Sequence, residues 1–68
     1  MYYRKEESKR LKYNQMVICR CPNWCDEGYQ VGRWNGKEFT YEADPNGWFD
    51  RDVIAFMPLN EDGEPTRL

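Results

Sequence analysis

The sequence contains no histidine and only three cysteines among its 68 residues. Without an imidazole, proton transfer at neutral pH would depend on carboxylates or on a thiolate, and no cysteine has an obvious base near it in the sequence. We therefore do not expect an enzyme, and no motif calls for a cofactor. The odd number of cysteines also argues against a complete disulfide framework.

The three cysteines are the one candidate metal site. Cys19 and Cys21 share a face if their segment is a strand, and Cys25 follows closely. Zinc takes four ligands, however, so Asp26, Glu27 or a second copy of the chain would have to complete the site. We expect buried free thiols that pack as small apolar residues. A zinc site and a disulfide between Cys21 and Cys25 are the alternatives.

Long apolar segments are also missing. No run approaches the roughly 20 residues that a membrane helix requires, and the N-terminus lacks the apolar core of a signal peptide. We expect a cytoplasmic protein without membrane contact, in which the cysteines stay reduced.

Charge is divided along the chain, although the net charge is only -2. Residues 1–13 hold five basic and two acidic residues, whereas the rest of the chain has a net charge of -5. Nucleic-acid-binding domains usually present a basic face on their folded part. Direct nucleic-acid binding is therefore not expected. We interpret 1–13 as a solvated, charged helix or arm in which Glu6 pairs with Arg10 at helical spacing.

The remaining sequence predicts a small antiparallel sheet. Apolar and β-branched runs, separated by turn-forming residues, favour about four strands. They cover 15–21, 28–34, 37–42 and 52–57. The expected fold class is β-rich α+β: a single domain, 1–68, with a meander sheet within 15–59, a short N-terminal helix or arm over 1–13 and a polar tail over 60–68.

The Asn-Gly dipeptide at 35–36 predicts a two-residue type I′ hairpin turn, because both central residues need a positive φ. Arg33 would then pair with Glu38 across the strands, and Gly32 would lie beneath the ring of Phe39. Alternation places the aromatic rings on one face of the hairpin, which we expect to be the core face. The predicted core aromatics are Trp34, Phe39, Tyr41 and Phe56.

Three segments carry a resemblance: Val17-Ile18 in the first strand, the hairpin 32–39, reading GRWNGKEF, and the last strand 53–59, reading VIAFMPL. Their order resembles a family of short phage and prophage proteins of unknown function. That family has a V-I/L-V-type strand, a G-Y-W-N/D-G-K-x-F/W hairpin and an ending V-x-x-W-M-P-L-P. Here Phe56 replaces the tryptophan and Asn60 the final proline, and the charged arm replaces a tryptophan followed by E-R-L-P.

The resemblance implies an accessory protein of a virus or mobile element, located in the host cytosol. It carries no catalytic residues to transfer to this chain. Small proteins from that setting often bind and inhibit a host factor, including bacterial defence complexes such as CRISPR nucleases. A host protein or defence complex is therefore the expected partner.

Loop aromatics beside acidic residues are the candidate binding site, because tryptophan and tyrosine give large contact area at small entropic cost. The predicted binding residues are Trp24, Asp26, Glu27, Tyr29, Trp48, Phe49 and Asp50. In the alternative, these rings fold back and cap the small core. A homodimer paired along the first and last strands is a second expectation. A zinc/thiol-based module and a self-assembling phage structural component are the alternative functions.

Overall fold

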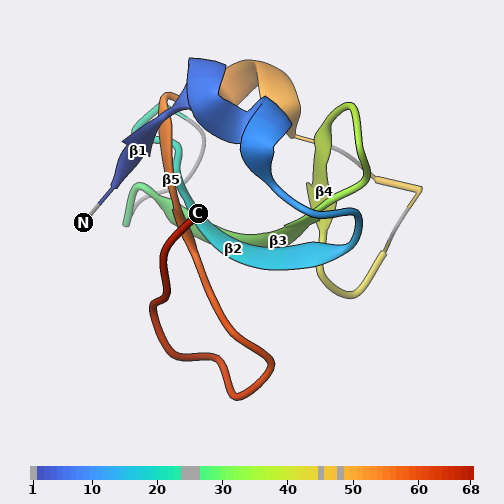
Figure 1. Ribbon diagram of the computed structural model, residues 1–68. Helices are drawn as coiled ribbons and strands as arrows, with labels where there is room; N and C mark the ends of the chain where they lie inside the picture. The colour runs from blue at the N-terminus through green and yellow to red at the C-terminus, as the bar shows by residue number, and fades with distance from the viewer. Residues whose placement is uncertain (1, 24–26, 45, 48) are drawn as a thin grey trace.

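The computed structural model describes residues 2–23, 27–44, 46–47 and 49–68. In these ranges it has one antiparallel sheet, ordered β1-β5-β2-β3-β4, and two short 3-10 helices (Figure 1). The elements are β1 (Tyr3–Arg4), η1 (Lys5–Arg10), β2 (Gln15–Arg20), β3 (Tyr29–Trp34), β4 (Phe39–Tyr41), η2 (Asp50–Asp52) and β5 (Ala55–Pro58). The small, β-rich antiparallel domain predicted from the sequence is confirmed.

The last strand returns to the middle of the sheet. β2, β3 and β4 follow one another as a meander, but β5 pairs with the other side of β2, where Met57 lies opposite Ile18. The two-residue β1 then pairs with β5, and Tyr3 lies opposite Phe56. The predicted first and last strands, β2 and β5, therefore pair with each other, and β1 pairs with the other edge of β5. Among the described residues both strands thus lie inside the sheet rather than at its edges, and the homodimer stays a prediction.

The charged N-terminal segment packs against the body of the protein as η1. Ser8 in η1 is buried, and Leu11, which follows it, belongs to the core. Arg10 pairs with Glu7, at 3.3 Å between the guanidinium and the carboxylate. The predicted pair with Glu6 required α-helical spacing, whereas residues three apart are neighbours in a 3-10 helix.

One face of the sheet carries the core, beneath η1 and η2 (Figure 1). The buried cluster contains Leu11, Val17, Cys19, Cys21, Trp34, Phe39, Phe49, Val53 and Phe56, with Tyr41 packed against it. Phe39 is central: its ring centroid lies 4.9 Å from that of Trp34, edge to face, and 5.6 Å from that of Phe56. The predicted core aromatics are confirmed, and so is the burial of Cys19 and Cys21.

The β3–β4 hairpin has a longer loop than predicted. Trp34 lies opposite Phe39, so the loop spans the four residues 35–38. Because the register differs from the predicted one by two residues, every side chain keeps its predicted face. The ring above Gly32 is therefore that of Phe49 rather than Phe39, and a Cβ at position 32 would lie only 2.8 Å from it.

The side chain of Asn35 explains the longer loop. Its Oδ1 accepts hydrogen bonds from the backbone N–H groups of Lys37, at 2.8 Å, and of Glu38, at 2.6 Å. The N–H of Asn35 in turn donates to the carbonyl of Glu38, at 3.0 Å. Gly36 supplies the positive φ, 93°, that the loop needs. An asparagine side chain that takes over two backbone donors makes the four-residue loop stable.

Gly47, Phe49 and Asp50 lie along the outer edge of β4. The N–H of Tyr41 donates to the carbonyl of Gly47, at 2.9 Å, and the N–H of Phe49 donates to the carbonyl of Phe39, at 3.2 Å. The N–H of Phe39 donates to Oδ1 of Asp50, at 3.1 Å. Three outward backbone groups of this edge strand, the N–H and carbonyl of Phe39 and the N–H of Tyr41, thus have partners within the chain.

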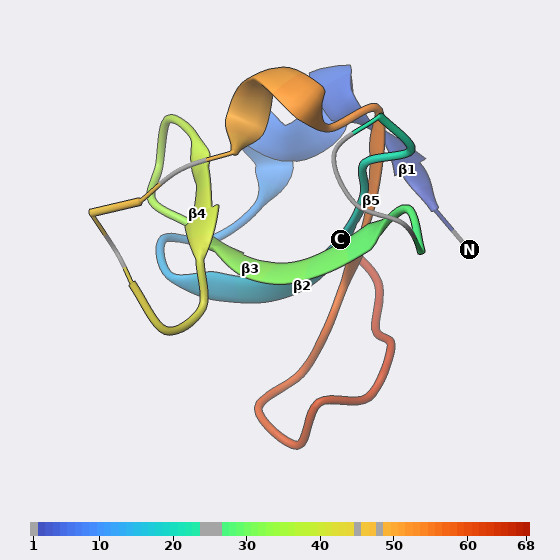
Figure 2. The same ribbon diagram turned by 180° about the vertical axis from the view of Figure 1, so that it is seen from behind.

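The C-terminal segment forms a closed loop that extends beyond the end of β5, away from η1 and η2 (Figures 1 and 2). Oδ1 of Asn60 accepts hydrogen bonds from the N–H groups of Asp62 and Glu64, which fixes the turn. Leu68 packs against the core, and its N–H lies 3.5 Å from the hydroxyl oxygen of Tyr3. The predicted polar tail, 60–68, is therefore polar at its turn but anchored at its end.

Candidate binding surface

The strands present a second face, directed away from the core. By alternation from the buried residues, its members on β1, β2, β3 and β5 are Arg4, Met16, Ile18, Arg20, Tyr29, Val31, Arg33, Ala55 and Met57. We call these residues the outward face. It contains four large aliphatic side chains, a tyrosine and three arginines, and it contains no acidic residue.

The centre of the outward face is apolar. Ile18 lies between Val31 of β3 and Met57 of β5. Val31 is 41% exposed and Tyr29 is 49% exposed. Both 3-10 helices lie on the other side of the sheet (Figure 2), so they cover the core face rather than the outward face.

Tyr2 extends the outward face beyond the end of β3. Its ring centroid lies 6.1 Å from that of Tyr29, with the two planes tilted by 41°. Partial burial, and secondarily the neighbouring Tyr29 hydroxyl, raise the pKa of Tyr2 above its ordinary value. Tyr2 is therefore a neutral phenol at physiological pH, and the pair forms an aromatic corner with hydrogen-bonding hydroxyls.

The arginines of the outward face differ in their surroundings. Arg33 is fixed: its guanidinium donates to the carbonyl oxygen of Asn14, at 3.0 Å, and pairs with Glu42, at 3.1 Å. The predicted pair with Glu38 was wrong, because the longer loop moves that residue beyond the end of the strand. Arg4 and Arg20 are exposed and form no ion pair with any residue that the structure describes.

A groove of about 870 Å³ adjoins the outward face, between segment 10–16 and the C-terminal loop. We call it the tail groove. Met16 and Arg33 line it and also belong to the outward face, so the two surfaces are continuous. The other cationic side chains in its lining are Arg10, Lys12 and Arg67, and among the described lining residues the one acidic side chain is Glu61.

The structure divides the binding residues predicted from the sequence. Trp24, Asp26 and Trp48 lie outside the described residues. Glu27 is exposed in the turn before β3. Tyr29 is exposed and belongs to the outward face, and its role in binding stays a prediction.

Phe49 follows the alternative interpretation, in which a loop ring caps the core. Only 2% of it is exposed. Its ring packs over Gly32 and lies 5.1 Å from the ring of Tyr41, centroid to centroid. Its assignment to the binding surface was wrong, because the absence of a side chain at position 32 opens a hole in the sheet that the ring fills.

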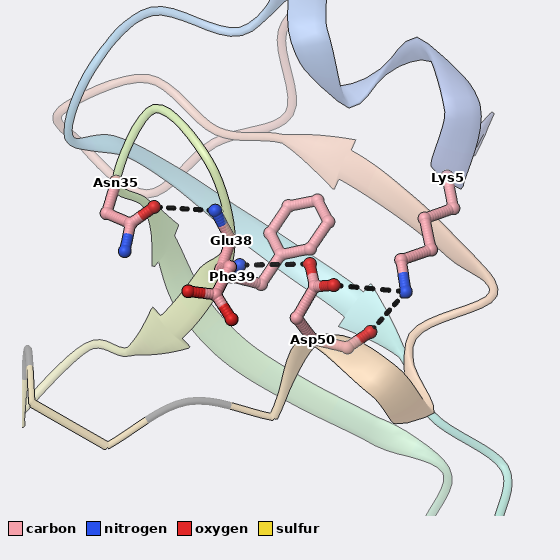
Figure 3. Close-up of polar contacts among 5 residues, drawn as sticks. All are labelled: Lys5, Asn35, Glu38, Phe39 and Asp50. Atoms are coloured by element: carbon pink, nitrogen blue, oxygen red, sulfur yellow. Dashed lines mark hydrogen bonds and ion pairs between the residues drawn. The ribbon is translucent and has the colours of Figure 1, made fainter.

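Asp50 holds three elements together (Figure 3). One carboxylate oxygen accepts the backbone N–H of Phe39, and the other lies 3.2 Å from Nζ of Lys5. The same ammonium group donates to the carbonyl oxygen of Asp50. Its carboxylate is thus engaged in joining η1, β4 and η2, and it is not a free binding group. The partners lie 11 and 45 residues away in the sequence, which is why the sequence pattern could not reveal them.

The thiols of β2 are core groups. Cys19 and Cys21 are both fully buried. Burial, followed by the nearby Cys21, raises the pKa of the Cys19 thiol far above its ordinary value. The thiolate that a metal or an electrophile requires is therefore suppressed at Cys19. The structure brings no group of three or more potential metal ligands together among the described residues, and Cys25 lies outside them.

The sequence did contain a signal for the outward face. Residues 16–19 are apolar at four successive positions, so β2 is apolar on both faces. A strand with this pattern is typically covered on both sides. Among the described residues the core lies on only one side of β2, so the other apolar side is a candidate binding surface.

None of the helices among the described residues has the length and apolar character needed to cross a membrane. No family model, no curated protein and no solved structure matches the chain.

Proposed function

We propose that this chain is a small binding protein that acts through protein–protein contacts at the outward face. The observation that carries the proposal is an accessible sheet face with an apolar centre, formed by Ile18, Val31 and Met57, beside Tyr29 and Arg20. Tyrosine, methionine and arginine are enriched in protein interfaces. Contiguous apolar patches on small domains commonly mark interaction sites.

The resemblance to short phage and prophage proteins supports a host protein as the partner. We propose inhibition by occupancy: the chain covers a surface that a host factor, such as a CRISPR-type defence complex, needs for its own work. A domain of this size suits that role, since a standard protein interface buries only about 800 Å² per partner. The proposal also places the protein in the host cytosol.

The acidic and aromatic loop surface predicted from the sequence stays a prediction, because 24–26 and 48 lie outside the described residues. Tyr29 is common to both surfaces. The outward face differs from the loop surface in charge: its ionic groups are the arginines at 4, 20 and 33. Binding at the outward face therefore favours a partner surface with carboxylates.

The test compares Val31→Asp with the control Ile54→Asp. Both residues are exposed and aliphatic, but Ile54 lies before the start of β5 and is not a member of the outward face. The tagged protein and both variants are used to capture partners from a bacterial host lysate. Any captured protein is identified by mass spectrometry, purified and tested directly for binding.

We expect capture by the parent protein and by Ile54→Asp, and loss of capture by Val31→Asp, with both variants folded by circular dichroism. Phage plating on a host with an active CRISPR-type system should show the same order if the partner is a defence complex. If the two variants captured the partner equally, the outward face would not be its binding site. Capture of a protein that is not a defence factor would redirect the proposal to another host target.

A further inference from the structure

The tail groove contains two cationic side chains that the fold leaves without a carboxylate. Arg10 pairs with Glu7 and Arg33 with Glu42. Lys12 and Arg67 are both exposed, and neither forms an ion pair with any described residue. Exposed cations held around a concave surface favour an anionic ligand there.

The two cations approach the groove from different parts of the chain. Lys12 lies in the connection between η1 and β2. Arg67 is carried back to the sheet by the C-terminal loop, because the N–H of Thr66 donates to the carbonyl of Pro58, at 2.9 Å, and Leu68 packs against the core. Contacts of the residue before Arg67 and of the residue after it therefore hold Arg67 beside the groove.

Apolar surface accompanies these charges. Tyr13 is 79% exposed and lines the groove beside Lys12. Met16 and Leu68 are half-buried in the same lining. A volume of about 870 Å³ lies within the range, about 300–1,000 Å³, that accommodates ligands or several side chains. The groove is thus suited to a ligand that is both acidic and apolar.

We propose that the tail groove receives an acidic peptide segment of the protein partner. Its carboxylates pair with Lys12 and Arg67, and an apolar side chain of the segment packs on Tyr13 and Met16. This inference rests on the proposed function and deepens it, because the groove continues the outward face through Met16 and Arg33.

The charges favour an acidic peptide over two other possible occupants, a second copy of the chain and a nucleic acid. A second copy that met the outward face with its own outward face would bring arginines against arginines without an acidic residue of that face between them, and like charges oppose such an interface. Nucleic-acid affinity grows with the number of phosphates that cations neutralise. Two unpaired cations in the described lining are few for that purpose, whereas two carboxylates of a peptide match them.

The test uses short fluorescent peptides and the full chain. One peptide combines glutamate with leucine, a second has lysine in place of glutamate, a third has serine in place of leucine, and an oligothymidylate serves as a polyanion without apolar side chains. Affinities are measured by fluorescence anisotropy for the parent protein, for Lys12→Glu/Arg67→Glu, and for Arg51→Glu. Arg51 is an exposed arginine on η2 that does not line the groove.

We expect the glutamate–leucine peptide to bind most tightly, and to lose about tenfold in affinity with the double variant but less than about twofold with Arg51→Glu. Raising the salt concentration should weaken this binding. Equal affinity for the lysine peptide, stronger binding of the oligonucleotide, or an unchanged affinity of the double variant would each overturn the inference. So would a concentration-dependent dimer, seen in sedimentation, that the double variant abolishes.

The captured partner distinguishes this inference from the proposed function. If Val31→Asp abolishes binding of the partner and Lys12→Glu/Arg67→Glu does not, the outward face binds the partner and the tail groove does not. If neither variant changes binding of the partner, both proposals fail. Loss of binding with each variant supports both.

Discussion

Replacement of Phe49 by alanine should remove most of the stability of this protein. The ring is almost fully buried over Gly32 and against Tyr41, and a buried Phe→Ala change costs about 3–5 kcal/mol. A chain of 68 residues has a total stability of only about 3–10 kcal/mol, at 0.05–0.15 kcal/mol per residue. The variant should therefore be partly or wholly unfolded at 37 °C.

Thermal unfolding followed by circular dichroism measures the effect. For a domain of this size 1 kcal/mol shifts Tm by about 4–8 °C, so Phe49→Ala should lower Tm by at least about 12 °C. Tyr13→Ala is the matched control: its ring is exposed, and removal should cost no more than about 0.5 kcal/mol. Equal Tm values for the two variants would refute the assignment of Phe49 to the core and return it to the loop surface.

Two further predictions concern polar and thiol groups of the core. Asp50→Ala should destabilise the protein by about 1–3 kcal/mol in urea unfolding, because the buried N–H of Phe39 loses its acceptor; an unchanged urea midpoint would contradict this role. Cys19 should resist alkylation by iodoacetamide in the folded protein and react after addition of guanidinium chloride, as mass mapping would show. An alkylation rate in the folded protein equal to that in the unfolded protein would contradict the burial. Because folding raises the pKa of this thiol, its contribution to the free energy of unfolding should be complete below the pKa of an unfolded cysteine, about 8.5. The contribution should fall as pH rises above that value.

Local patterns sufficed for the strands and for the core face. Alternation in 15–21 and in the hairpin assigned Cys19, Trp34 and Phe39 to the buried side, because side-chain direction in a strand depends only on sequence parity. The predicted faces of the hairpin residues stayed correct although the register was wrong, because a difference of two residues leaves parity unchanged.

Contacts between distant segments were beyond those patterns. The bond from Phe39 to Asp50 and the ring of Phe49 over Gly32 depend on the path of the chain from β4 to β5. That path depends on the position of β5 beside β2, which the predicted meander did not contain. Composition likewise described a basic arm and an acidic body, whereas folding brings Lys12 of the arm to the same groove as Arg67.

The covered edge of β4 has a consequence for the protein in a crowded cell. Small sheets are prone to add strands from neighbouring molecules, and this is how many of them begin to aggregate. The N–H groups of Phe39 and Tyr41 and the carbonyl of Phe39 already bond to Gly47, Phe49 and Asp50, and the opposite edge, β1, offers only two residues. The chain can thus present an apolar sheet face to a partner while the two edges of the sheet offer little free backbone for fibril growth.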